Sequence, residues 1–270
     1  MFIAFNYTPT KNFYNTELNN YMTKGASLYS EHESNVQGCL SKFISPDGTI
    51  NGSELRENWF SVENTDVFIS HSHKDINKVK AFAGWLSERF GLTSFVDSCA
   101  WGYCDELLHT IDKKYCYNKK KGTYDYELRN YTTSHVHMML STALVETMNR
   151  SECIIFFNTP QSIVMSNELE SIKKKQRTTS PWIFYELTMI SRLNRIPPNR
   201  DNYFLEHSAY EVKGKPNIQY DVSAVLDRMP TIYDLDLLKW REGHSLYKHP
   251  LDELYEIKKC GLKRTSNKRE

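Results

Sequence analysis

Long apolar runs are missing from this sequence, both at its start and along its length. Residues 1–13 interrupt their few apolar side chains with Asn6, Thr8 and Lys11, whereas a secretory signal needs a continuous apolar core. No other segment approaches the roughly 20 consecutive apolar residues that a membrane-spanning helix requires. We therefore expect a cytoplasmic protein with no membrane partner.

An excess of one charge is also missing. The 34 Lys and Arg residues balance 33 Asp and Glu residues, which leaves a formal net charge of +1. Such a chain has no overall field that would attract a polyanion, so we expect no nucleic-acid partner. The 270 residues, of which 40% are hydrophobic, are enough to bury a core without disulfides.

Neither the cysteines nor the common ligand-binding motifs indicate a metal or a separate cofactor. The six cysteines are scattered and form no CxxC pair, and without an export signal we expect them to be free thiols. Two HxH pairs, at 71–73 and 135–137, are too weak a pattern for a metal site and favour capping or surface roles. A Walker A loop and a GxGxxG motif are both absent from the sequence.

Short apolar runs alternate with segments of helical spacing from residue 66 onward. The predicted strands are residues 67–69, 93–97 and 153–157, with weaker candidates at 217–222 and 231–238. The predicted helices are 76–90, 105–115, 135–149 and one that begins at Ser180–Pro181, where serine suits the N-cap and proline the first turn. Ser72 is predicted to cap the first of these helices, with Asp75 three residues on in a variant of the capping box. This alternation predicts an α/β fold with a central parallel sheet and helices on both faces.

The strength of this pattern divides the chain into three regions. Residues 1–64 have weak periodicity and are predicted to form an N-terminal extension, with one helix around 16–29. Residues 65–250 carry the alternation of strands and helices, interrupted by a polar insertion at about 104–131. Residues 251–270 are predicted to be a basic C-terminal tail that frays.

Three segments are expected to meet outside the carboxyl ends of the strands, where parallel α/β sheets bind their ligands. They are residues 70–73, 97–102 and 158–162, together with the helix that follows the last of them. In that helix Trp182 and Glu186 are four residues apart, so an aromatic ring and a carboxylate share one face. The same spacing also fits an ordinary helix with a buried Trp and a solvated Glu.

Four segments resemble, in order, the signature elements of TIR (Toll/interleukin-1 receptor) domains. Residues 66–72 (DVFISHS) resemble strand A, 94–97 with the loop 98–103 strand B and the BB loop, 153–160 (CIIFFNTP) strand C, and 180–187 (SPWIFYEL) helix C. The last segment is similar to the WxxxE element of prokaryotic NAD-cleaving TIR domains, in which the Glu is catalytic. Two features depart from the family: residues 104–131 exceed the usual length, and strands D and E have no clear counterpart.

The resemblance implies a flavodoxin-like TIR domain that uses NAD as its substrate, with no separate cofactor and no metal. It makes Glu186 the catalytic residue. The substrate-binding residues that it implies are Ser70, His71, Ser72, Asp97, Trp101 and Trp182. It further implies a homo-oligomer formed through TIR contacts and, as in prokaryotic anti-phage defence, a separate effector protein that responds to the product.

Cleavage of the nicotinamide–ribose bond suits a site with a single carboxylate. The leaving group is a pyridinium cation that departs as neutral nicotinamide, so it needs no general acid, unlike the leaving oxygen of an ordinary glycoside. An ionised Glu186 would accept hydrogen bonds from the ribose hydroxyls and stabilise the oxocarbenium-like transition state. Trp182 would stack on a base, and the N–H groups at the helix start near Ser72 would hold the pyrophosphate. Attack by water gives ADP-ribose and attack by a hydroxyl of ADP-ribose gives a cyclic product; the sequence leaves both open.

Two other classes of protein stand beside the enzyme. A non-catalytic TIR module that works by association, as in animal adaptors, has no need of Glu186. A flavodoxin-like phospho-receiver shares the fold class but needs an acidic cluster after its first strand, where this chain has Ser70, His71 and Ser72. The carboxylate at the WxxxE position therefore favours the enzyme.

Overall fold

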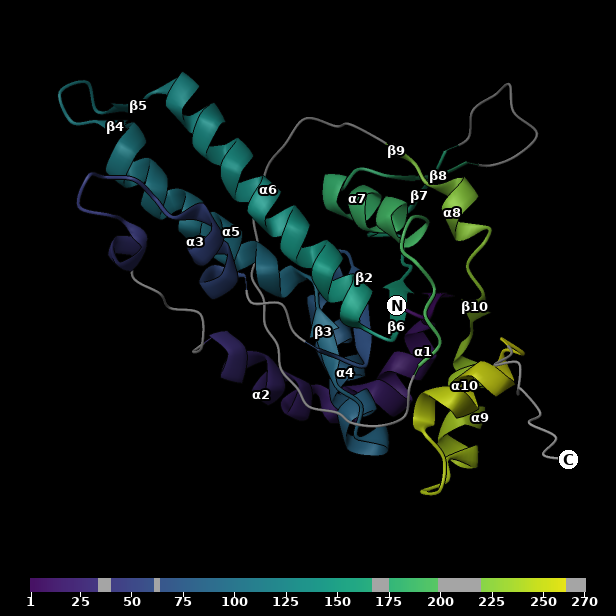
Figure 1. Cartoon of the computed structure of the whole chain (residues 1–270). Coiled ribbons are helices and arrows are strands. Elements are labelled where there is room, and N and C mark those ends of the chain that lie inside the picture. The colour runs from purple at the N-terminus through teal and green to yellow at the C-terminus, as the bar shows by residue number, and fades with distance from the viewer. Residues whose placement is uncertain (34–39, 61–63, 167–174, 199–219, 261–270) are drawn as a thin grey trace, which may run out of the picture.

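The computed structural model describes residues 1–33, 40–60, 64–166, 175–198 and 220–260. Its centre is a sheet of five parallel strands with helices on both faces (Figure 1), which confirms the predicted fold class at this level. In sheet order the strands are β10 (Thr231–Ile232), β1 (Ile3–Tyr7), β6 (Cys153–Phe157), β2 (Val67–His71) and β3 (Ser94–Val96).

The helices form one layer on each face of this sheet. One layer contains α1 (Lys11–Phe13), α2 (Met22–Glu33), α4 (Ile76–Phe90), α9 (Asp234–Gly243) and α10 (Pro250–Ile257). The other contains α3 (Gly52–Trp59), α5 (Ser98–Ile111), α6 (Tyr126–Arg150), α7 (Pro181–Ile190) and α8 (Ser223–Leu226). Short turns of 3-10 or π-helix are η1 (Tyr14–Leu18), η2 (Asn19–Tyr21), η3 (Leu40–Phe43), η4 (His73–Asp75) and η5 (Asp112–Cys116).

Alternate residues of the central strands supply two hydrophobic clusters, one on each face. Cys153, Ile155 and Phe157 of β6 join the cluster on the side of α2 and α4. Ile154 and Phe156 join the cluster on the side of α5, α6 and α7. All five residues of β6 are buried and apolar because side chains of a strand point alternately to two faces, and helices cover both.

The first strand of the chain lies inside the sheet. All five residues of β1 pair in parallel with β6, and β1 also pairs with β10 on its other edge. Strand β1 and the buried side chains of Phe13, Leu18 and Tyr21 therefore belong to the core, although the sequence predicted residues 1–64 to be an N-terminal extension. The weak periodicity of this region misled the prediction, because a strand of five residues is too short to show which neighbours it pairs with.

Helix α2 packs against α4 at two glycines. A Cβ placed on Gly25 would lie 1.8 Å from the carbonyl oxygen of Lys80, and one placed on Gly84 would lie 2.4 Å from that of Tyr21. Both distances are shorter than any contact a real Cβ makes, so this close backbone approach requires glycine at both positions. The contact joins α2 firmly to the helix that follows β2.

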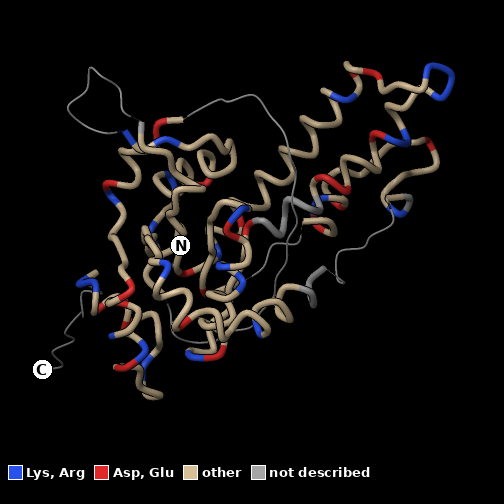
Figure 2. The backbone as a smooth tube through the Cα atoms, turned by 180° about the vertical axis from the view of Figure 1, so that it is seen from behind, with Lys and Arg blue, Asp and Glu red and all other residues tan. Residues whose placement is uncertain are grey.

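The predicted insertion 104–131 belongs to an arm that runs from α5 to α6 and projects from the sheet (Figure 1). Between η5 and α6 the arm contains a hairpin of β4 (Tyr117–Asn118) and β5 (Thr123–Tyr124). Lysines 119 to 121 lie in the loop between these strands, at the tip of the arm (Figure 2).

The backbone of residues 98–103, predicted as the BB loop, is the first part of α5, so this prediction is wrong. Gly102 did not end the helix, since one glycine costs a helix only about 1 kcal/mol.

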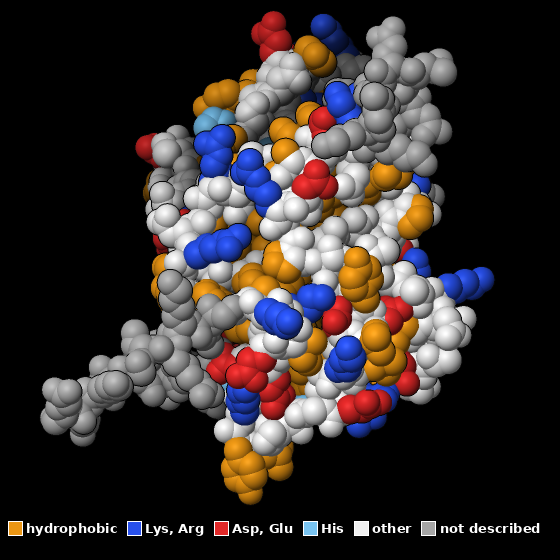
Figure 3. Space-filling model, turned by 90° about the vertical axis from the view of Figure 1, so that its right-hand side faces the viewer, with side chains coloured by type: hydrophobic (Ala, Val, Ile, Leu, Met, Phe, Trp, Pro, Cys, Tyr) orange, Lys and Arg blue, Asp and Glu red, His pale blue; other side chains and the backbone are white. Residues whose placement is uncertain are grey.

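The C-terminal part contributes helices where a tail was predicted. Leu251, Leu254 and Tyr255 of α10 are buried against the sheet, which corrects the predicted tail 251–270 up to residue 260; residues 261–270 lie outside the described part. On this side of the molecule, charged side chains of both signs lie among hydrophobic ones (Figure 3). None of the described helices has the length and apolar character to cross a bilayer.

The weaker strand candidates are confirmed only in part. Within 217–222, β9 (Tyr220–Asp221) completes a small antiparallel sheet with β7 (Val164–Ser166) and β8 (Lys175–Thr178). Within 231–238, only the first two residues form β10, and α9 begins at Asp234. Asp234 and Asp236 in the first turn favour the helix there, because acidic side chains stabilise the positive end of the helix dipole.

Candidate active site

Buried polar side chains gather at the carboxyl ends of β2, β3 and β6. After β2 the chain forms β3 on one side, and it returns through the arm to form β6 on the other side. Such a reversal of strand order is where parallel α/β sheets open a ligand crevice. Ser70 and His71 end β2, Asp97 follows β3 and Thr159 follows β6, and none of the four is more than 6% exposed.

Helix α7 adds Glu186 to this group. The helix begins at Pro181, and the Ser180 hydroxyl accepts a hydrogen bond from the N–H of Ile183 at 3.2 Å, as predicted for its N-cap. Glu186 lies on the inward face of the helix and has no exposed surface. The Ser70 hydroxyl donates a hydrogen bond to Glu186 Oε2 at 2.6 Å. The fold thus joins two of the predicted site residues directly.

Asp97 holds His71 through two contacts. Its Oδ1 lies 2.5 Å from His71 Nδ1, and its Oδ2 accepts a hydrogen bond from the backbone N–H of His71 at 3.3 Å. Burial lowers the pKa of His71 to about 4, although a hydrogen bond to the Ile69 carbonyl and the charges of Glu186 and Asp75 oppose the shift. The imidazole is therefore neutral at pH 7, and its Nδ1–H donates to Asp97.

The pKa of Glu186 shifts in the opposite direction to that of His71. Burial, and next the negative charge of Asp97, raise the pKa of Glu186 well above its usual range, while the hydrogen bond from Ser70 lowers it. This arrangement therefore favours the protonated form of Glu186. A proton also allows a hydrogen bond from Glu186 to Asp97, which two ionised carboxylates cannot form. The ionised Glu186 expected from the chemistry is thus not the form that the closed crevice favours.

A further buried carboxylate, Asp75, borders the crevice, and the sequence reasoning assigned it only a capping role. The Thr159 hydroxyl donates to Asp75 Oδ2 at 2.5 Å, and Lys78 Nζ lies 2.6 Å from Asp75 Oδ1. These contacts tie η4, which follows β2, to the loop after β6. Asp75 comes four residues after the end of β2, at the carboxyl edge of the sheet. This position in the sequence was the signal that could have identified Asp75 as a residue of the crevice.

Ser72 does not act as the predicted helix cap. It is half-buried and precedes η4, and its side chain makes no capping hydrogen bond. Its carbonyl oxygen instead accepts the backbone N–H of Asp75 at 2.8 Å, and α4 begins only at Ile76. Because Asp75 binds Thr159, it is not available for the reciprocal contact that a capping box needs.

The two tryptophans of the predicted cleft have different outcomes. Trp182 is half-buried and packs edge to face against His137 of α6, with ring centroids 5.4 Å apart, and against Tyr185 at 6.4 Å. These contacts place it at the margin of the hydrophobic cluster, one turn from Glu186. The backbone of Trp101 lies in α5, and its side chain is outside the described part of the structure.

Comparison with known proteins found no match to any family model, curated protein or solved structure. The TIR resemblance therefore rests on the four sequence segments and their order. Three of these segments supply residues that meet at the crevice: Ser70 and His71, Asp97, and Glu186. The remaining segment, 153–160, supplies Thr159 from its last residues, which follow β6.

Proposed function

We propose that this chain is a flavodoxin-like TIR domain that cleaves the nicotinamide–ribose bond of NAD, with Glu186 as the catalytic residue. The observation that carries the proposal is the 2.6 Å hydrogen bond from Ser70 to Glu186, which joins residues 116 positions apart in the sequence. One residue comes from the segment that resembles strand A, and the other from the WxxxE segment. Contact between these two segments is what a common substrate cleft requires.

The strand order supports the flavodoxin-like assignment and accounts for its main departure. The run β3-β2-β6 has the 2-1-3 order of flavodoxin-like sheets. The fourth place belongs to β1, which comes from the start of the chain, and the fifth to β10. The place of strand D is thus filled from the N-terminal side, which explains why no segment directly after helix C aligns with it.

The proposed mechanism depends on whether Glu186 is protonated or ionised. The closed crevice favours the neutral acid, whereas stabilisation of an oxocarbenium-like transition state needs the carboxylate. A bound nicotinamide ring carries a positive charge, and a cation near a carboxyl lowers its pKa. Binding of NAD therefore promotes the ionised form of Glu186 that the reaction uses. Ser70 then stays a donor to the carboxylate and holds its orientation.

Access to Glu186 requires motion, because this side chain has no exposed surface. Substrate-induced opening and closing of such a crevice is common among enzymes. TIR-type assembly is one way to drive it, so we propose a homo-oligomer as the active form, with a separate effector protein as the reader of the product. Specific activity that rises with protein concentration, and falls in Trp101→Ala, would support assembly; constant activity from a monomer would exclude it.

The test is incubation of the purified protein with NAD, with nicotinamide release as the readout. Glu186→Gln is expected to lower the rate by about a hundredfold or more, because an amide cannot stabilise the developing positive charge. Its melting temperature should not fall, since glutamine matches the neutral form of the carboxyl that the closed crevice favours. Glu253→Gln is the matched control, as Glu253 is a buried glutamate on α10 that accepts from the Ser245 N–H at 2.8 Å.

Two outcomes would contradict the proposal. Near-normal release by Glu186→Gln would remove this residue from the chemistry, and no release by the wild-type protein at any concentration would favour the non-catalytic module. Mass analysis of the product separates ADP-ribose from a cyclic nucleotide, which is lighter by one water.

A further inference from the structure

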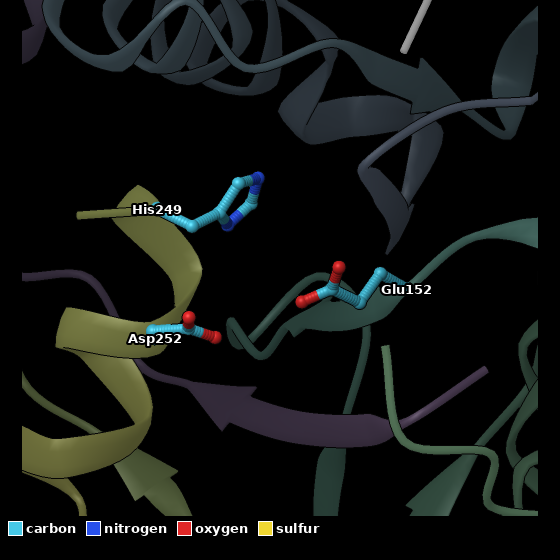
Figure 4. A group of neighbouring side chains, drawn as sticks. All are labelled: Glu152, His249 and Asp252. Carbon is cyan, nitrogen blue, oxygen red and sulfur yellow. The ribbon is translucent and has the colours of Figure 1, made fainter. Parts of the chain in front are cut away.

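A second group of ionisable side chains lies at the amino end of the sheet, opposite the crevice. Glu152 immediately precedes β6, and His249 and Asp252 come from the start of α10. Each residue offers one ligand-type atom, and these three atoms lie within 4.8 Å of one another. Figure 4 shows the two carboxylates and the imidazole directed into a common gap between α10 and the sheet. All three residues are half-buried.

The backbone and a neighbouring side chain hold this group in place. His249 is the N-cap of α10 and Asp252 follows three residues later, so both project from the same side of the helix. One turn further along, the Tyr255 hydroxyl donates to Glu152 Oε1 at 2.8 Å. The carbonyl of Glu152 accepts the backbone N–H of Phe2 at 2.6 Å. Such supporting contacts orient the ligands of protein metal sites.

The donor set indicates the class of cation. Two carboxylates and one imidazole suit a divalent transition metal such as Zn²⁺, whereas Ca²⁺ and Mg²⁺ prefer oxygen ligands alone. We propose that Glu152, His249 and Asp252 bind one zinc-class divalent ion, which fastens α10 to the amino end of β6. Water would complete the coordination, since the chain supplies three ligands. The Leu251 N–H donates to His249 Nδ1 at 3.3 Å, a long hydrogen bond that the metal would replace if it takes that nitrogen.

A proton on His249 is the alternative to a metal ion at this site. A protonated His249 between two carboxylates would also link α10 to β6, without a metal. The two cases differ in their pH dependence, because a metal binds neutral imidazole and displaces a proton from it. Affinity for the metal should therefore be higher in alkaline than in acidic buffer.

The experiment uses the full-length protein after treatment with a chelator. Calorimetric titration with Zn²⁺ should show one site, and Co²⁺ should give d–d absorption without the charge-transfer band of a cysteine thiolate. His249→Gln and Asp252→Asn should each weaken binding at least tenfold. His244→Gln should bind as the wild type does, because His244 pairs with Glu253 at 2.8 Å on the same side of the molecule and outside the triad.

Thermal unfolding gives an independent readout. Zn²⁺ should raise the melting temperature of the wild type and of His244→Gln, but not that of His249→Gln or Asp252→Asn. If His249→Gln does not fold, Glu152→Gln and Asp252→Asn decide the matter. The proposal is overturned if the wild type binds no metal, if a thiolate band accompanies Co²⁺, or if the triad variants that fold bind as tightly as the wild type.

Discussion

Two buried aspartates lie at opposite ends of the β2–β3 pair, and their surroundings differ. Asp66 precedes β2, and its Oδ2 accepts hydrogen bonds from the backbone N–H and the hydroxyl of Thr93, at 2.7 and 2.8 Å. Asp97 follows β3 and faces His71 together with a second acid, Glu186. The carboxyl of Asp66 thus accepts hydrogen bonds from Thr93. The carboxyl of Asp97 faces one donor, His71, and a second acid, Glu186.

The difference separates a carboxylate with a structural role from one at the proposed active site. Donors around Asp66 offset the cost of removing its charge from water, so this end of the pair ties β2 to the residue before β3. Around Asp97 the charges do not balance, and burial together with the negative charge of Asp97 raises the pKa of Glu186. Burial of an acidic residue alone does not mark a site; two acids held together at a crevice do.

The largest effect that we expect at the carboxyl end is on the pH profile of NAD cleavage. In the proposed mechanism the ionised Glu186 is the active form, so kcat/KM should fall about tenfold for each unit of pH below its raised pKa. The profile of kcat should break at a lower pH, because bound NAD brings a positive charge to the carboxyl. Asp66→Asn should leave both breaks in place. A rate that stays flat from pH 5 to 9 would show that Glu186 does not titrate in the reaction.

Acid stability gives the next largest effect. The pKa of His71 is near 4 in the folded protein against an ordinary value of 6.5, so its contribution to stability is present above pH 6.5 and is lost as the pH falls to 4. The loss is on the order of 3 kcal/mol. His71→Asn keeps a donor near the Nδ1 position but cannot titrate, and its urea unfolding curves should shift less between pH 7 and 4.5. Equal shifts in both proteins would assign the acid sensitivity to other groups.

Removal of the charge at the amino end should affect stability and not catalysis. Asp66→Asn weakens two hydrogen bonds to a buried carboxylate, which is expected to cost about 1–3 kcal/mol in the free energy of unfolding. Turnover per folded molecule should remain that of the wild type. Loss of activity at full folding would mean that the two ends of the β2–β3 pair are coupled.

The smallest effect concerns Trp182 at the edge of the crevice. His137→Ala removes its edge-to-face partner and should cost about 0.5–1.5 kcal/mol in stability while leaving cleavage intact. Trp182→Phe should retain part of the activity and Trp182→Ala less, if the ring stacks on the substrate. A parallel loss of activity and melting temperature in Trp182→Ala and His137→Ala would instead assign the ring to packing alone.

The side chains that meet at the crevice were easier to predict from the sequence than the order of the strands that hold them. Ser70, His71, Asp97 and Glu186 could be identified because they lie beside short apolar runs or at helical spacing after one, and these local patterns fix the edge of the sheet. Asp75 was given only a capping role because its burial depends on Thr159, a contact between distant segments. The protonation of Glu186 also needs the distance to its neighbours, which no spacing contains.

The sequence did not predict which strands lie next to one another, for a similar reason. The five residues of β1 show that a strand can form but not that it lies between β6 and β10. The start of α5 was predicted as a loop because residues 98–103 resemble the BB loop, whereas burial of Leu107 and Ile111 stabilises the helix from further along.

The position of β1 has a consequence for how the chain folds during synthesis. Ile3 pairs with Cys153 and Asn6 with Thr231, so β1 cannot complete its ladder until these two much later segments have been made. Contacts so distant in sequence slow folding, because a long loop has to close before they form. Docking of α2 onto α4 at Gly25 and Gly84 joins nearer segments and can occur earlier. The glycine contact therefore keeps β1 beside the growing sheet, and a side chain at either glycine should delay folding more than it disturbs the finished crevice.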